Sequence, residues 1–193
     1  MNANGAALLA NPHPCGHIVY PYTDENLVGQ AACLFASAGL HAGEGVILIM
    51  TEAHYQPIRL RLQVEGFNVE SYERSGQLIC AHAEKLIARF MSEGMLNSEL
   101  FKSTIGDFIR RVRTSMSNSH PARVRAFGEM VSLLRHTNLG AATQMEELWN
   151  DVIQEHSISL LCSYSMLHTH DQIEETLKAL HTHNIDAERS AGR

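Results

Sequence analysis

The chain has 193 residues, of which 45% are hydrophobic, and its 21 acidic and 15 basic residues give a net charge of -6. This length and composition predict one folded domain and exclude a disordered, collagenous or coiled-coil chain. The negative charge is unfavourable to nucleic acid and to anionic lipid, and the apolar run at residues 46–50 is too short to span a bilayer, so we expect neither partner.

The two ends of the chain are expected to lie outside the domain. The first 14 residues contain no Lys or Arg that could form the charged start of a signal peptide, which predicts a cytoplasmic protein. Four widely spaced cysteines without a C-x-x-C pair are typical of thiols in a reducing compartment. We predict a flexible segment over residues 1–14, a single domain over 15–183 and a flexible tail over 184–193.

The first half of the chain alternates strands and helices. A strand is predicted over residues 17–22, and a helix follows from the caps Thr23 and Asp24 to Gly39. The apolar run at 46–50 is typical of a parallel strand covered on both faces. The pattern then predicts a helix over 54–66, a strand over 67–72, a short strand over 78–80 and a helix over 83–91.

The second half continues the alternation. Ser98 is predicted to cap a long amphipathic helix, and a turn is expected at 118–121. Strands are predicted over 124–127 and 158–164, with helices over 129–135 and 141–155 between them. Asp171 resembles the first residue of a capping box that opens a last helix to about His181. The alternation predicts an α/β fold of three layers, with a mostly parallel sheet flanked by helices.

Several common enzyme signatures are absent from the sequence. None of the three lysines follows a glycine, so the chain has no phosphate-binding P-loop. The pair Gly43 and Gly45 precedes a strand, whereas a dinucleotide fingerprint follows one. There is also no G-x-S-x-G elbow and no H-E-x-x-H zinc motif.

Histidine is abundant, with twelve residues, and raises the question of a metal. The cluster His13-x-Cys15-x-His17 offers ligands that suit zinc or copper, but its spacing on an irregular segment is weaker evidence than paired C-x-x-C motifs. We expect no metal and keep this cluster as the candidate site of an alternative, metal-binding sensor. Two later pairs, 168–170 and 181–183, flank the last predicted helix, where histidine suits the helix dipole.

Polar and aromatic side chains gather where the predicted strands end. Ligands of open parallel sheets bind outside the carboxyl ends of the strands, so these residues are the candidate ligand-binding set. The set is Tyr20, Tyr22, Thr51, His54, Arg125, Glu129, Cys162 and Tyr164. A buried Arg125 needs a carboxylate partner such as Glu129, and that pair could be an internal salt bridge or could contact a ligand.

Five separated blocks resemble the MEDS family, the methanogen/methylotroph DcmR sensory domain. They are HIVYPYTDENL, FASAGLHAGEGVILIMTEAH, RVRAFGEMVSLL, ELWNDV and ISLLCSYSM, which together cover about residues 15–170. The most specific residues are Gly39, Leu40, Gly43 and Glu44 in the second block and Arg125, Phe127, Gly128, Glu129 and Met130 in the third.

The resemblance implies a sensory, ligand-binding domain of prokaryotic signal transduction that detects hydrocarbon derivatives such as small C1 compounds. It also implies a RecA/KaiC-like fold, in which the loop after Tyr20 takes the Walker A place and Glu129 lies near the Walker B place. That loop has no lysine here, so the fold is expected to lack a Walker A loop and ATP turnover is not expected.

The chain departs from relatives that carry further modules. DcmR-like repressors have a helix-turn-helix segment before this domain, and other relatives look fused to histidine kinase modules. Only sixteen residues precede His17 here, and no kinase motif follows. We therefore expect a free-standing sensor that signals as a homo-oligomer or by docking on a histidine kinase or transcription regulator.

Three functional hypotheses follow. The first is a non-catalytic sensor without a resident cofactor that binds a small, fairly apolar ligand. The second is a degenerate nucleotide-binding protein for ATP or ADP with magnesium, in which Glu129 positions the metal or water and Arg125 meets phosphate. The third is an enzyme that uses Glu129 or His54 as acid or base and Cys162 as nucleophile, although a cysteine on an apolar strand is more often inert.

Overall fold

The structure is a computed structural model that describes residues 2–116, 123–167 and 172–185. A six-stranded sheet with the order β3-β2-β6-β7-β1-β8 forms its centre, and all of the strand pairs in it are parallel. Its strands are β1 (His17–Tyr22), β2 (Gly45–Met50), β3 (Leu78–His82), β6 (Val124–Gly128), β7 (Ser159–Ser165) and β8 (His183–Asn184). The short strands β4 (Met91–Ser92) and β5 (Met95–Leu96) pair separately as an antiparallel hairpin.

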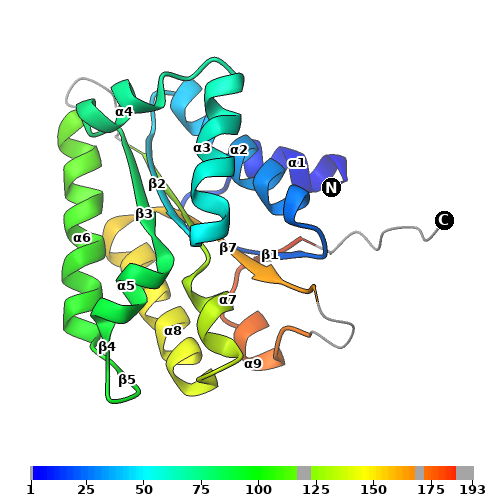
Figure 1. The fold of residues 1–193 in the computed structure, drawn as a ribbon, viewed down its shortest axis with the longest axis vertical. Helices are drawn as coiled ribbons and strands as arrows, with labels where there is room; N and C mark the ends of the chain where they lie inside the picture. Colours follow the sequence, from blue (N-terminus) through cyan, green and yellow to red (C-terminus); the bar gives the residue numbers. More distant parts are fainter. Residues whose placement is uncertain (1, 117–122, 168–171, 186–193) are drawn as a thin grey trace.

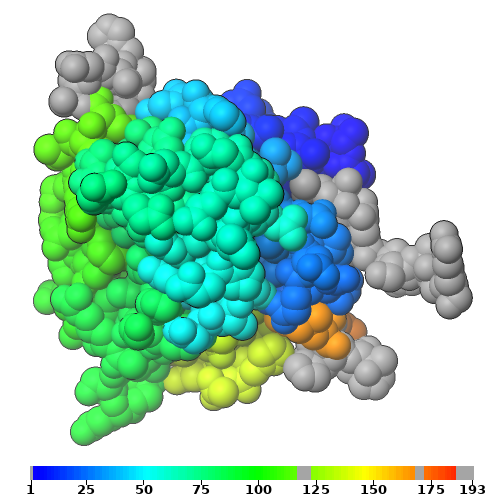
Figure 2. Space-filling view, turned by 45° about the horizontal axis from the view of Figure 1, so that its top comes forward, coloured from blue at the N-terminus to red at the C-terminus, as the bar shows by residue number. Residues whose placement is uncertain are grey.

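Helices cover both faces of the sheet and make three layers (Figure 1). One face carries α1 (Ala3–Ala10), α2 (Glu25–His41), α3 (Glu52–Val64) and α4 (Val69–Ser75). The other carries α5 (Ala83–Phe90), α6 (Ser98–Ser115), α7 (Met130–Arg135), α8 (Leu139–His156) and α9 (Glu175–Lys178). Figure 2 shows how α2, α3 and α4, in blue to teal, cover much of one side of the molecule. The three-layer α/β fold predicted from the sequence is confirmed.

The central strands are apolar throughout because each contributes to two cores. Along β2, Val46, Leu48 and Met50 face the core beneath α2 and α3, whereas Ile47 and Ile49 face the core beneath α6 and α8. Successive side chains of a strand point to opposite faces, so a strand covered on both sides loses the usual alternation of apolar and polar residues. The same alternation of faces decides which of the predicted site residues can meet.

Two segments in the first half of the chain adopt a structure other than the expected one. Residues 67–72, predicted as a strand, contain the start of α4, because the Asn68 side chain accepts a hydrogen bond from the Ser71 amide and caps the helix. The first residues, expected to be a flexible segment, form α1. The Asn2 side chain caps this helix, and Leu9 is buried beneath it, so the segment is part of the fold.

The C-terminal segment is also more closely attached than expected. The last helix is only the four residues of α9, shorter than the predicted helix to His181. Asn184, assigned to the tail, pairs with β1, and Ile185 is buried. The predicted turn at 118–121, the cap Asp171 and the tail residues 186–193 lie outside the described residues. Within the described ranges, no helix has both the length and the apolar character needed to cross a membrane.

Candidate functional site

A buried carboxylate marks the carboxyl edge of the sheet. Glu129 follows β6 directly, and one of its oxygens accepts hydrogen bonds from the Thr51 amide at 2.8 Å and the Thr51 hydroxyl at 3.2 Å. Its other oxygen lies 2.7 Å from Nδ1 of His54. Thr51 is the single residue between β2 and α3, and it is the N-cap of α3. The Glu129 charge therefore also lies at the positive end of that helix.

His54 connects Glu129 to the surface. Its Nε2 atom contacts the carboxylate of Glu25, whose side chain is 54% exposed, whereas the Glu129 side chain is only 2% exposed. Burial alone lowers the pKa of His54, but the hydrogen bonds and charges of Glu129 and Glu25 outweigh it and raise the pKa to about 9. At neutral pH the site therefore holds an imidazolium between two carboxylates.

Tyr22 completes this group, which we call the strand-end site: Tyr22, Glu25, Thr51, His54 and Glu129. The Tyr22 ring lies edge-on to His54 with the ring centres 6.0 Å apart. Burial and the nearby charges of Glu129 and Glu25 raise the pKa of Tyr22 well above its usual value, so it is a neutral phenol. Tyr20 lies on the same face of β1, with its hydroxyl 3.5 Å from the Leu27 carbonyl oxygen.

The connection from β1 to α2 consists only of Thr23 and Asp24. The Asp24 side chain accepts a hydrogen bond from the Asn26 amide and so caps α2, and Glu25 occupies its first turn. A helix N-terminus is favourable for anions, but here two carboxylates of the protein already occupy it. The edge of the sheet is therefore built around protein carboxylates.

Arg125 does not join the strand-end site. Its guanidinium lies 2.5 Å from the Glu44 carboxylate and donates to the Phe35 carbonyl oxygen at 2.8 Å. The predicted partner Glu129 is four residues further along and lies beyond the end of β6, whereas Arg125 points under α2 near the start of that strand. The expectation of an Arg125–Glu129 pair is wrong, because Arg125 forms a buried salt bridge with Glu44 instead.

Cys162 and Tyr164 lie on the other face of the sheet. The register of β1 with β7 pairs Val19 with Cys162 and Pro21 with Tyr164, so these two side chains alternate with those of Tyr20 and Tyr22. Both side chains contact Glu146 of α8, and Sγ of Cys162 also lies 3.4 Å from Nε2 of His17. Burial and the Glu146 charge raise the pKa of the Cys162 thiol well above its usual value. Cys162 is therefore not placed as a nucleophile beside His54 and Glu129.

The N-terminal cluster does not converge either. The His13 ring stacks on His183 with 5.1 Å between the ring centres, and only His17 of that cluster takes part in a group of potential metal ligands within the described part of the chain. That group is His17, Glu146, Cys162 and His181, and we call it the buried cluster. The prediction missed Glu146 and the partnership of His181 with His17. One feature of the sequence points to Glu146: its carboxylate lies on the apolar stripe of its helix, three residues before the buried Trp149.

A comparison with known protein families gives a match to this chain. The sequence profile of the family described as MEthanogen/methylotroph, DcmR Sensory domain (MEDS) matches residues 16–184. A search of curated proteins found no match to this chain. Because the profile covers most of the chain, including every residue of the strand-end site, the chain belongs to the MEDS family of sensory domains.

Proposed function

We propose that this domain is a non-catalytic sensor of prokaryotic, cytoplasmic signal transduction that binds a small hydrocarbon derivative or C1 compound at the strand-end site. The family supports a sensory role. The location of the strand-end site supports its role in binding, since ligands of parallel α/β sheets bind at the carboxyl ends of the strands. The buried rings of Tyr20 and Tyr22 offer apolar faces beside the charged groups of His54 and Glu129.

The observation that carries this proposal is the hydrogen-bonded series Glu129, His54 and Glu25. Its members come from the end of β6, from α3 and from the start of α2. A change at His54 therefore affects α2 and α3, two helices of the same layer. A ligand signals only if it binds two arrangements of the protein with different affinity. A ligand that takes the place of the exposed Glu25 carboxylate beside His54 would favour a different position of α2 relative to α3.

A degenerate nucleotide-binding protein of RecA/KaiC type is the alternative, and two features of the structure count against it. The acidic N-terminus of α2 is unfavourable to phosphate, because Asp24 and Glu25 already occupy it. Arg125, the cation assigned to phosphate, is buried against Glu44. Binding of ATP or ADP with magnesium would nevertheless be visible in the same experiment as binding of a C1 compound.

We propose that the signal leaves through contacts between chains, either in a homo-oligomer or with a histidine kinase or transcription regulator. The helix that carries His54 supports this part of the proposal. Leu60 and Val64 of α3 are 61% and 80% exposed, and residues four apart lie on the same side of a helix. Leu60 and Val64 thus form a small exposed apolar patch toward the C-terminal end of the helix that carries His54.

Native mass spectrometry and thermal unfolding test the proposal together. We would record oligomer and retained molecules, and then the melting temperature with methanol, methylamine, dichloromethane or Mg-ATP. A ligand at about 100 times its Kd stabilises the native state by about 2.7 kcal/mol, which raises the melting temperature by roughly 5–10 °C for a chain of this size.

The matched variants are Glu129→Gln in the site and Glu65→Gln at an exposed position after α3. The proposal predicts that a C1 compound stabilises the wild type and Glu65→Gln but stabilises Glu129→Gln much less. Equal stabilisation of all three would place the ligand elsewhere. Stabilisation by Mg-ATP alone would favour the nucleotide-binding alternative.

A further inference from the structure

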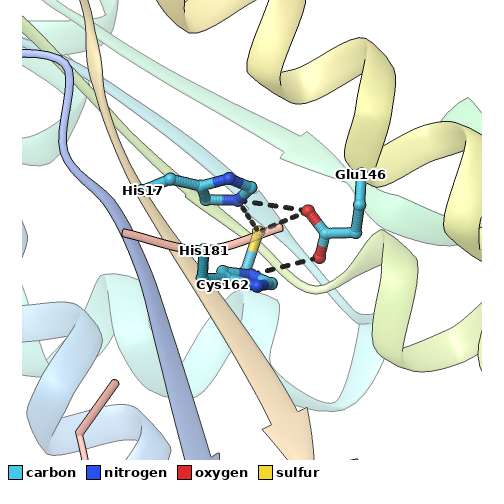
Figure 3. Close-up of side chains that lie close together, drawn as sticks. All are labelled: His17, Glu146, Cys162 and His181. Atoms are coloured by element: carbon cyan, nitrogen blue, oxygen red, sulfur yellow. Dashed lines mark hydrogen bonds and ion pairs between the residues drawn. The ribbon is translucent and has the colours of Figure 1, made fainter. Parts of the chain in front are cut away.

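The buried cluster brings four side chains from distant parts of the chain to one point beneath α8. His17 begins β1, Cys162 lies within β7, Glu146 comes from α8, and His181 follows α9 (Figure 3). The side chains of both histidines and of Glu146 are at most 1% exposed, and Cys162 is buried. Groups of this polarity are not buried together without a strong compensating interaction.

One potential ligand atom from each of the four residues lies within 4.8 Å of the others, close enough for the four side chains to bind one metal ion. Nε2 of His17 lies 3.1 Å from Oε2 of Glu146 and 3.4 Å from Sγ of Cys162. Nε2 of His181 lies 3.4 Å from Oε1 of Glu146, and Sγ of Cys162 lies 3.8 Å from Oε2. A tetrahedron with metal–N and metal–O bonds of about 2.0–2.1 Å and a metal–S bond of about 2.3 Å has ligand atoms about 3.3–3.6 Å apart.

The opposite ring nitrogens fix which atoms face the centre. Nδ1 of His181 lies 2.8 Å from the Leu177 carbonyl oxygen, which can only accept. Nδ1 of His17 lies 2.9 Å from Oδ1 of Asn150, and the amide group of Asn150 donates to the Leu180 carbonyl oxygen, so Oδ1 is the acceptor. Each histidine therefore carries a proton on Nδ1, as metal-ligating histidines do, and turns Nε2 toward the cluster.

This arrangement requires a proton or a cation at its centre. If both imidazoles are neutral, two Nε2 lone pairs face the oxygens of Glu146, which is repulsive unless a proton or a cation lies between them. Nε2 of His181 is buried and has no hydrogen-bond partner. The Glu146 carboxylate is in turn oriented by the Tyr164 hydroxyl, which donates to Oε1 as an outer hydrogen bond to a metal ligand would.

We propose that His17, Glu146, Cys162 and His181 bind one divalent transition-metal ion, with Zn²⁺ the preferred ion. Imidazole and thiolate suit zinc, and four protein ligands without exposure to solvent are typical of a closed, structural site. A thiolate and a carboxylate also balance the charge of a divalent ion, which favours its burial. The ion would join β1 at the start of the chain to the segment after α9 near its end.

Metal analysis of untagged protein tests the proposal first. We expect about one zinc per chain after purification, and stripping with a chelator should lower the melting temperature, which added Zn²⁺ should restore. Titration of the stripped wild type with Co²⁺ should give the visible bands of a tetrahedral ion and a thiolate-to-cobalt charge-transfer band. This readout on the wild type does not depend on whether any variant folds.

Two matched pairs of variants locate the ion. Cys162→Ser should abolish the charge-transfer band, whereas Cys15→Ser should keep it, because Cys15 lies outside the buried cluster. His181→Gln should lower Co²⁺ affinity by at least about tenfold, whereas His183→Gln, two residues away, should leave it unchanged. A stripped wild type that gives no Co²⁺ bands and no thermal response to Zn²⁺ would overturn the proposal, as would a band that survives in Cys162→Ser and disappears in Cys15→Ser.

Discussion

Nδ1 of His54 lies 2.7 Å from Oε1 of Glu129, and the other ring nitrogen of His54 contacts Glu25. The imidazole thus lies between a buried and an exposed carboxylate, on three different elements of the fold. His54 therefore links the carboxyl ends of the strands to helix α3 and to solvent.

The stability of the protein should depend on pH through His54. The pKa of His54 is raised to about 9 in the folded state, compared with about 6.5 in an unfolded chain, so the folded state binds the proton more tightly. The resulting stability is fully present below about pH 6.5 and is lost as the pH rises through about 9. We expect His54→Gln to remove roughly 2–3 kcal/mol of this pH-dependent stability, measured by urea unfolding at pH 6, 7.5 and 9.5. An identical pH dependence in wild type and variant would refute the assignment.

The charge of Glu129 should maintain the raised pKa of His54. Glu129→Gln keeps the shape of the side chain and removes its negative charge, which favours the imidazolium. We expect the pKa of His54 to fall by roughly 1–2 units, measured by NMR titration of its ring. Glu65→Gln is the control and should leave the pKa unchanged. A wild-type His54 that titrates near 6.5 would show that the two carboxylates do not hold the proton.

Arg125 should matter for stability and not for ligand binding. Arg125→Ala leaves the buried Glu44 without its closest partner, which typically costs about 3–5 kcal/mol. For a chain of this size the melting temperature should fall by roughly 6–20 °C. The exposed Arg110→Ala should change stability by no more than about 0.5 kcal/mol. A variant of Arg125 that stays stable but loses the response to ligand would contradict the internal role.

Gly39 of α2 should tolerate no side chain. A Cβ atom at this position would lie 2.6 Å from both Cδ and Nε of Arg125, which is fixed by Glu44 and by three carbonyl oxygens. We expect Gly39→Ala to destabilise by about 1–3 kcal/mol. Gly140→Ala in α8 meets only ordinary contacts and should be neutral or stabilising by up to about 1 kcal/mol. Thermal unfolding of the two variants distinguishes the outcomes, and equal stability would show that Arg125 can move aside.

The sequence was sufficient to predict the sheet, because its central strands are continuous apolar runs between helical patterns. It was also sufficient to predict that Tyr22, Thr51, His54 and Glu129 lie together at one edge of the sheet, since parallel strands end on the same side. The prediction was wrong where a short segment fits both the pattern of a strand and the pattern of a helix. Residues 67–72 alternate like a strand, but Asn68 caps a helix there.

Contacts between distant residues could not be predicted in the same way. Arg125 has a carboxylate near it in sequence, Glu129, but pairs with Glu44, which is 81 residues away. The two most specific blocks of the family resemblance meet here, because Gly39 and Glu44 both pack against Arg125. Cys162 was assigned to the wrong group because the register of β1 and β7, which sets its face, is not visible in either strand alone.

The central claim is that a small molecule binds beside His54, and the NMR signal of the His54 ring tests it most directly. We would label the histidines, assign His54 with the His54→Gln variant, and titrate methanol, methylamine and dichloromethane separately. The account predicts that one of these compounds shifts the His54 signal to saturation at the concentration that raises the melting temperature, while the His13 signal stays in place. Thermal stabilisation with an unchanged His54 signal would contradict the account, because the ligand would then bind away from the strand-end site.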